Sequence, residues 1–188
     1  ISACLVGSEM CIRDRNIVST DWLEQHLEAP DIRIIDSSWY FPQEKRNAEQ
    51  EFLECHIPGA SFFDIDKIKD NDSDLPHMLP PSAMFNSTVR KLGIGDGHKV
   101  VIYDGLGMRS AARLWWMFKV FGYSDVVVLD GGFPKWVKEN RSTTAEITEK
   151  EIRHLTIYED KSIVADRDDV LRATKLNHCS IIDARSEG

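Results

Sequence analysis

The stretch from Val100 to Ser110 limits the possible folds more than any other part of the chain. It starts with a short, β-branched apolar run, passes through Gly105 and Gly107, and leads into an apolar segment that favours a helix. Such a run is typical of a central strand in a parallel sheet, and the glycines permit a tight turn after it. The stretch therefore predicts an α/β fold with a loop at the carboxyl end of the strand, where such folds bind ligands.

The loop after this strand has the composition of an anion cradle that lacks a nucleophile. Its residues are Asp104, Gly105, Leu106, Gly107, Met108 and Arg109. Backbone N–H groups of a turn, together with a helix N-terminus, attract negative charge. The loop contains no Cys, Ser or His, the side chains that most often attack a substrate. Arg109 could pair with Asp104 or bind an anion; a salt bridge or a solvated surface position is the favoured alternative.

Composition and charge exclude several classes of protein. The chain has 188 residues, of which 42% are hydrophobic and 29% charged, and its net charge is −8. An acidic globular chain is not expected to bind nucleic acid, and no apolar run approaches the roughly 20 residues that cross a membrane. Cys4, Cys11, Cys55 and Cys179 lack metal or disulfide spacing. We therefore predict no metal, no cofactor and a reducing, cytoplasmic compartment.

Residues 1–15 differ from the rest of the chain. They show neither helical nor strand periodicity, and they contain no apolar core long enough for a signal peptide. The run from Leu5 to Arg15 resembles one reading frame through a transposon-end sequencing adapter. Our hypothesis is that residues 1–15 are a non-native, adapter-derived tail and that genuine sequence begins near Asn16. A native N-terminal tail is the alternative.

The rest of the chain alternates short apolar strands with helices. Strands or helix starts are predicted at residues 19–23, 33–36, 82, 100–103, 110 and 126–129. This alternation predicts a parallel sheet flanked by helices on both faces. Ser82 is expected to cap its helix. Residues 64–81 form a long, acidic loop that contains prolines, and loops of that length are usually functional or disordered.

The sequence pattern starts again in the last part of the chain. Ile17-Val18 recurs as Ile163-Val164, and Ile34-Ile35-Asp36 recurs 147 residues later as Ile181-Ile182-Asp183. Two matches at nearly equal offsets predict a tandem duplication. Chance recurrence of common apolar dipeptides is the alternative.

The duplication predicts how the chain divides into domains. Residues 16–139 would form one complete domain, and the polar residues 140–161 would form a linker. Residues 162–188 would begin a second domain that the chain does not complete. We expect this last segment to be mobile or loosely docked, because its apolar side chains have little to pack against.

Six separated motifs, in order along the chain, resemble motifs of the rhodanese superfamily. The resemblance is closest to the two-domain thiosulfate/3-mercaptopyruvate sulfurtransferases. The motifs are Val18–Leu23, Phe52–Ala60, Pro76–Pro80, Ala112–Phe118, Leu129–Trp136 and Ser180–Arg185. The resemblance covers about residues 16–188 and implies a rhodanese-like α/β fold.

The resemblance also implies a chemistry. In this family, a reactive cysteine opens the cradle of the C-terminal domain, accepts sulfane sulfur as a persulfide, and passes it to a thiol or cyanide. Here Asp104 stands at the matching position of the first domain, and a carboxylate cannot become a persulfide. We therefore expect residues 104–109 to be catalytically silent. The reactive cysteine is expected about 147 residues after Asp104, so this chain should be inactive.

The same resemblance assigns supporting residues and partners. Asp66 and His77, both in the long loop, are expected to support the active site by orienting or relaying a proton; two solvated loop residues are the alternative. His56 is expected to be a hydrogen-bonded residue of the fold. The implied partners are a small-molecule sulfur donor and a thiol acceptor, with a thioredoxin-like protein as one candidate. The oligomeric state is not predicted.

Two other functions remain open. The chain could belong to a non-catalytic rhodanese-like module that binds or regulates a partner. It could also be a relative of the cysteine-dependent phosphatases, but these need a cysteine at the start of the loop. Asp104 stands at that position, so the phosphatase hypothesis ranks last.

Overall fold

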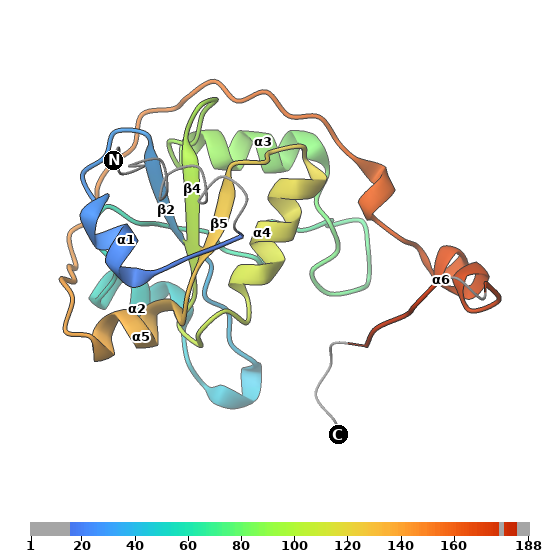
Figure 1. Cartoon of the computed structure of the whole chain (residues 1–188), viewed down its shortest axis with the longest axis horizontal. Helices are drawn as coiled ribbons and strands as arrows, with labels where there is room; N and C mark the ends of the chain where they lie inside the picture. Colours follow the sequence, from blue (N-terminus) through green and yellow to red (C-terminus); the bar gives the residue numbers. More distant parts are fainter. Residues whose placement is uncertain (1–15, 177–178, 184–188) are drawn as a thin grey trace, which may run out of the picture.

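The computed structural model describes residues 16–176 and 179–183, so the hypothesis about residues 1–15 lies outside the described residues. Within them, five strands form one parallel sheet in the order β1-β5-β4-β2-β3. Figure 1 labels the central strands β5, β4 and β2. The strands are β1 (Ile17–Val18), β2 (Ile32–Asp36), β3 (Ser61–Phe62), β4 (Lys99–Tyr103) and β5 (Val126–Leu129). The predicted parallel sheet is confirmed.

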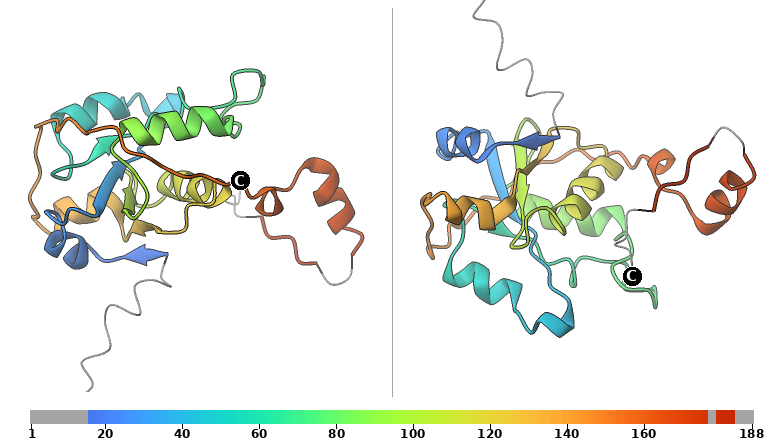
Figure 2. Two further views of the ribbon diagram at one scale, coloured as in Figure 1. Left: turned by 90° about the horizontal axis from the view of Figure 1, so that it is seen from above. Right: turned by 60° about the horizontal axis from the view of Figure 1, so that its bottom comes forward.

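Helices cover both faces of this sheet, as the alternating pattern predicted (Figure 2). The helices are α1 (Thr20–Gln25), α2 (Ala48–Glu54), α3 (Ser82–Lys91), α4 (Ala111–Val120), α5 (Gly132–Lys138) and α6 (Arg167–Ala173), with short 3-10 turns at Pro42–Glu44 and Lys161–Ile163. Helices α3 and α4 pack on one face, and α1, α2 and α5 pack on the other. Successive side chains of β4 alternate between the two faces, so both cores depend on this central strand.

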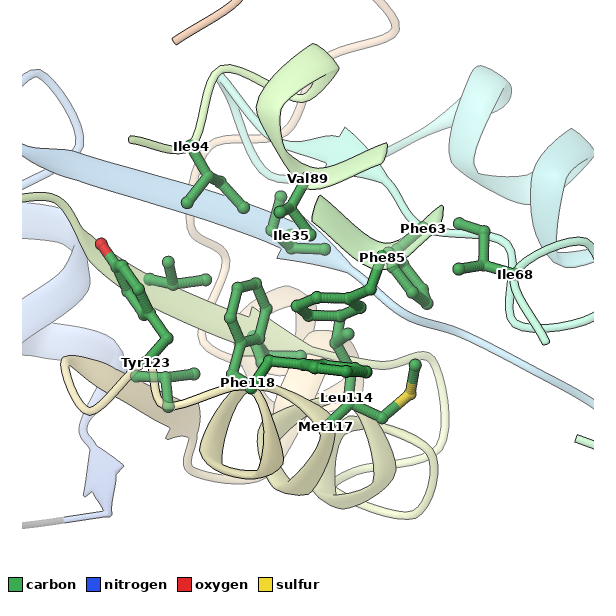
Figure 3. Close-up of a cluster of buried hydrophobic side chains, with 14 of the residues drawn as sticks. Ile35, Phe63, Ile68, Phe85, Val89, Ile94, Leu114, Met117, Phe118 and Tyr123 are labelled. Atoms are coloured by element: carbon green, nitrogen blue, oxygen red, sulfur yellow. The ribbon is translucent and has the colours of Figure 1, made fainter. Parts of the chain in front are cut away.

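The core beneath α3 and α4 is rich in aromatic side chains (Figure 3). Phe85 from α3 stacks on Phe121, with ring centroids 4.4 Å apart, and meets Phe118 of α4 edge-on at 5.1 Å. All three rings are fully buried. Their contacts fix α3 and α4 against each other and against β4, so the start of α4 has a defined place beside the sheet.

The start of α3 differs from the prediction. Ser82 is the first helical residue, and the capping position belongs to Pro81, which makes no side-chain capping bond. Proline cannot supply the oxygen that a serine cap would offer to the helix. The helix is instead stabilised by the burial of Phe85 and Val89.

Residues 140–161 follow the surface of the sheet and its helices as an extended segment, drawn in orange around the outside of Figure 1. Thr144 pairs with His56 through two backbone hydrogen bonds of 2.8 and 2.9 Å. Further along, Leu155 is buried in the aromatic core, and the Tyr158 amide donates to the Phe121 carbonyl at 3.1 Å. The segment is thus tied to the domain at several points along its length.

Residues 162–176 and 179–183 have a different environment. Helix α6 lies to one side of the sheet in both views of Figure 2. None of its side chains is buried, and Leu171 is 56% exposed. Ile182 is 87% exposed. The last part of the described chain therefore adds little to the core.

Candidate functional site

The loop from Asp104 to Ser110 joins β4 to α4 at the carboxyl edge of the sheet. Strands β4 and β2 are neighbours in the sheet. The chain continues from β4 to β5 on one side of this pair, and from β2 to β3 on the opposite side. The loops after these two neighbouring strands therefore diverge and leave a crevice between them. Open α/β sheets bind their ligands at such a point.

The Asp104 carboxylate occupies the cradle of N–H groups that this loop forms. Its Oδ1 accepts hydrogen bonds from the amides of Leu106 (2.8 Å) and Met108 (3.0 Å). Its Oδ2 accepts one from the Ala111 amide (2.8 Å), at the first turn of α4. Asp104 is 1% exposed. Three of the donors that could hold an external anion are thus already bound to a side chain of the loop itself.

The backbone of the loop is shaped to bring these donors together. Gly107 and Met108 both have left-handed conformations, with φ of 84° and 89°. Gly132, at the start of α5, lies so close that a Cβ there would be 2.6 Å from the Asp104 carbonyl oxygen. The loop is therefore held between β4, α4 and the start of α5.

Arg109 does not pair with Asp104, so that interpretation is wrong. Its guanidinium forms an ion pair with Glu44, at 3.2 Å, and lies over the ring of Phe41, 4.6 Å from its centroid. The reason is that the Asp104 carboxylate points inward to the backbone amides, whereas the Arg109 side chain is partly exposed.

A cavity of about 580 Å³ opens beside the loop. Apolar side chains dominate its lining, which comprises Trp39, Phe41, Ile65, Pro76, His77, Met78, Leu79, Arg109, Ser110, Arg113, Trp116, Val164 and Ala165. Two polar atoms of lining residues, Ser110 Oγ and Arg113 Nε, are buried and have no hydrogen-bond partner among the described residues. The cavity thus combines an apolar wall with unsatisfied polar groups and two guanidinium groups.

Asp66 and His77 meet at the edge of this cavity. His77 Nε2 lies 2.6 Å from Asp66 Oδ1. The His77 side chain is 25% exposed and that of Asp66 is 61% exposed. The structure brings the two predicted residues together, and their catalytic role stays a prediction.

Two further residues, which the sequence reasoning missed, contact this pair. The indole N–H of Trp39 donates to both carboxylate oxygens of Asp66, at 3.2 and 3.1 Å. The guanidinium of Arg113 donates to the backbone carbonyl of His77 at 2.6 Å. Nothing in the local sequence pattern indicates these contacts, because Trp39 and Arg113 come from distant segments.

A second crevice of about 230 Å³ lies at the carboxyl end of β2 and includes Asp36, Arg46, Cys55 and Gly105. Burial raises the pKa of Asp36 to about 6, and hydrogen bonds from the Ser38 amide and hydroxyl partly oppose that rise. Asp36 directly follows an apolar run in the sequence, and this position at the end of a buried strand could have predicted that its carboxyl group is buried.

A family model described as "Rhodanese-like domain" matches residues 19–139. The chain belongs to the rhodanese-like family. The matched region contains the filled cradle, the Asp66–His77 pair and most of the cavity lining. The predicted resemblance and α/β class are confirmed.

Known rhodanese-like relatives share this sequence at moderate to high identity. The rat protein named 3-mercaptopyruvate sulfurtransferase is 38% identical over 180 residues, covering 93% of this chain and 61% of the relative. The mitochondrial thiosulfate/3-mercaptopyruvate sulfurtransferase 1 of Arabidopsis thaliana is 53% identical over 120 residues, covering 64% of this chain and 32% of the relative. The chain therefore spans less than two thirds of these relatives.

A solved rhodanese structure agrees with the fold. The crystal structure of SseA from Escherichia coli, reported among 3-mercaptopyruvate sulfotransferases, superposes with a TM-score of 0.85 at 38% identity. The alignment covers 92% of this chain and 66% of that structure.

The other histidine and cysteine residues considered as candidates lie outside the cradle. His56 is buried and its Nδ1 lies 2.7 Å from the Phe52 carbonyl, as expected of a fold residue. Among the described residues, Cys55 is half-buried and Cys179 is exposed, and neither lies in the cradle. In the same residues, no cluster of His, Cys, Asp or Glu is arranged to hold a metal. No helix of the described chain has the length and apolarity that a membrane crossing requires.

Proposed function

We propose that this chain is part of a sulfurtransferase that moves sulfane sulfur from 3-mercaptopyruvate or thiosulfate to a thiol or cyanide. The names of the relatives support this substrate class. In this proposal residues 16–139 form a supporting domain, residues 140–161 a linker and residues 162–188 the start of a second domain. That second domain would carry the reactive cysteine, about 147 residues after Asp104. A thioredoxin-like acceptor and a cytoplasmic location belong to the same proposal.

The filled cradle is the observation that supports an inactive first domain. A rhodanese cradle with a cysteine would use its N–H groups to stabilise a thiolate and then an anionic persulfide. Here the three N–H groups already bind the two oxygens of Asp104. A carboxylate is not a sulfur nucleophile, so this loop lacks the reacting atom, and three N–H donors of the cradle already bind its own side chain.

The reaction itself needs a thiolate and a proton carrier. The thiolate attacks the sulfur of 3-mercaptopyruvate, a new S–S bond forms, and the C–S bond breaks with its electron pair going to carbon. That carbon then takes up a proton to give pyruvate. An acceptor thiolate next attacks the outer sulfur of the persulfide and releases the original thiolate. No external oxidant or reductant is required.

The cavity beside the loop supplies groups suited to this chemistry. Arg109 and Arg113 bring positive charge to a partly apolar wall, and both thiosulfate and 3-mercaptopyruvate are anions. His77, hydrogen-bonded to Asp66, carries an imidazole, a group that can accept or deliver a proton. Val164 and Ala165 also line the cavity, so the start of the proposed second domain lies beside it.

The proposal can be tested with two lengths of the protein. The 188-residue chain should release no pyruvate from 3-mercaptopyruvate with a thiol acceptor, and it should form no thiocyanate from thiosulfate and cyanide. A longer product of the same gene should do both, and replacing the cysteine of its second cradle by Ser should abolish both. Turnover by the 188-residue chain would contradict the proposal. An inactive long product without that cysteine would favour the non-catalytic module instead.

A further inference from the structure

The Asp66–His77 pair is held by contacts from two other segments, and these contacts determine what His77 can do. Asp66 lies in the long loop with a largely exposed side chain. An exposed carboxylate on a loop has many rotamers available, so a fixed bond to His77 needs additional support. The support comes from Trp39, which follows β2, and from Arg113 on α4.

Trp39 fixes the carboxylate. Its indole N–H lies 3.2 Å from Oδ1 and 3.1 Å from Oδ2 of Asp66, so it faces both oxygens at once. The same ring meets the His77 ring edge-on, with centroids 4.9 Å apart and planes at 82°. One side chain therefore restricts both the carboxylate and the imidazole that it binds.

Arg113 fixes the backbone of His77. The φ angle of His77 is 54°, a left-handed conformation that residues with a Cβ adopt at a cost. The Arg113 guanidinium donates a hydrogen bond of 2.6 Å to the His77 carbonyl and stacks over Trp116 at 4.6 Å. A charge-assisted bond from a packed side chain can hold the loop in this conformation.

These contacts also select one form of the imidazole ring. An ionised carboxylate only accepts hydrogen bonds, so Nε2 of His77 must carry the proton that bonds to Asp66. In the neutral ring, Nδ1 is then the proton acceptor. Nδ1 has no hydrogen-bond partner among the described residues, and His77 lines the cavity.

We propose that Trp39 and Arg113 are positioning residues that hold His77 with its Nε2–H bonded to Asp66 and its Nδ1 available to accept a proton from a ligand in the cavity. The use of that proton acceptor in sulfur transfer rests on the function proposed above. The positioning itself is a property of this chain and can be measured without turnover.

The test follows the Nε2-bound proton of His77 by NMR in the 188-residue chain with isotope-labelled histidine. His77→Gln assigns the signal among the six histidines of the sequence. Trp39→Phe keeps an aromatic ring but removes the N–H donor, so the exchange of this proton with water should accelerate roughly ten-fold. Arg113→Met should accelerate it in the same direction, and Arg113→Lys, which retains a donor, should have a smaller effect.

The matched control is Trp22→Phe, because Trp22 is also half-buried but stacks on His26, with ring centroids 4.2 Å apart. This variant should leave the His77 signal unchanged, and backbone amide spectra should show that all variants are folded. An unchanged exchange rate in folded Trp39→Phe would overturn the proposal for Trp39, and the same result in Arg113→Met would overturn it for Arg113. If a longer product of the gene shows normal exchange at His77 but has no sulfurtransferase activity, the result would instead count against the proposed function.

Discussion

Ile34 and Ile35, in the first copy of the repeated pattern, are 4% and 1% exposed, whereas their counterparts Ile181 and Ile182 are 53% and 87% exposed. The residue types are the same, and each pair precedes an aspartate. Only the first pair forms a strand: β2 lies between β4 and β3, with Ile34 opposite Val101 and Ile35 opposite Ile102. Among the described residues, the second pair belongs to no strand. A strand therefore depends on neighbours that its own sequence does not contain.

The helices of the two copies differ less than the strands. Helix α1 begins at a Ser19 cap, and α6 begins at a capping box between Asp166 and Asp169. Capping bonds are made within a few residues, so a helix can form from local signals wherever its segment lies. Within one chain, the comparison thus shows that helix formation can rely on local contacts, whereas strand formation needs contacts with distant segments.

Truncation of the chain should give the largest change in stability among the tests of this comparison. A chain that ends after Glu139 loses the buried Leu155 and the backbone bonds from Thr144 and Tyr158. We expect it to lose about 3–6 kcal/mol of unfolding free energy, whereas a chain that ends after Asp160 should keep nearly all of it. Urea unfolding measures both. Equal stability of the two truncated chains would show that residues 140–160 do not belong to the cooperative unit.

A matched pair of substitutions sharpens the contrast between the two copies. Ile35→Ala removes a fully buried side chain from β2 and should cost about 2–4 kcal/mol. Ile182→Ala changes an exposed residue and should alter stability by less than about 0.5 kcal/mol. Both are measured by chemical unfolding of the 188-residue chain. A substantial cost at Ile182 would mean that the second copy is packed in solution.

Asp36 provides a pH-dependent test. Because burial raises its folded pKa to about 6 from 3.8, the folded state holds its proton more tightly than the unfolded state. The stability contributed by this group should therefore be present below about pH 4 and be lost as pH rises to about 6. Asp36→Asn should flatten this dependence and raise stability at pH 7.5 by about 1–3 kcal/mol.

The control for Asp36 is its counterpart, Asp183→Asn, which leaves the buried carboxyl group in place. Thermal unfolding at pH 5 and pH 7.5 distinguishes the variants. The prediction is refuted if Asp36→Asn retains the full pH dependence of the unchanged chain.

The smallest expected difference concerns the helix caps. Ser19→Ala removes the oxygen that accepts the Trp22 amide and should cost about 1 kcal/mol, because α1 buries Leu23 in the core. Asp166→Ala removes the equivalent bond in α6, which has no buried residue, so global stability should be unchanged. Far-UV circular dichroism should report local loss of helix in the second variant. A global cost at Asp166 would contradict the contrast.

Much of the fold could be predicted because it depends on local patterns. The β-branched run in β4 and the apolar periodicity of α3 and α4 indicate their structures directly. The cap of α3 was predicted wrongly, because a serine next to Pro81 looks like a cap by itself. The path of residues 140–161 also escaped prediction, since burial of Leu155 depends on a groove made by other elements.

In the candidate site, too, the features that depend on neighbouring residues could be predicted and those that depend on distant segments could not. The cradle and the absence of a nucleophile follow from residues 104–109, which are contiguous. The contacts of Trp39 and Arg113 with the Asp66–His77 pair join three segments, so no spacing rule indicates them. For Arg109, the alternative of a salt bridge is found, but pairing with Asp104 is wrong, and its partner Glu44 could not be predicted because it lies in a distant turn.

The Asp104 carboxylate acts as a built-in anionic ligand of the β4–α4 loop. Loops that bind ligands are often among the less stable parts of a protein, and binding of the ligand can make them more rigid. Here the ligand is attached to the loop, so the site stays occupied at every concentration of free anion. We therefore expect the loop, and with it the cavity wall at Ser110, to keep the same conformation whether or not a ligand occupies the cavity.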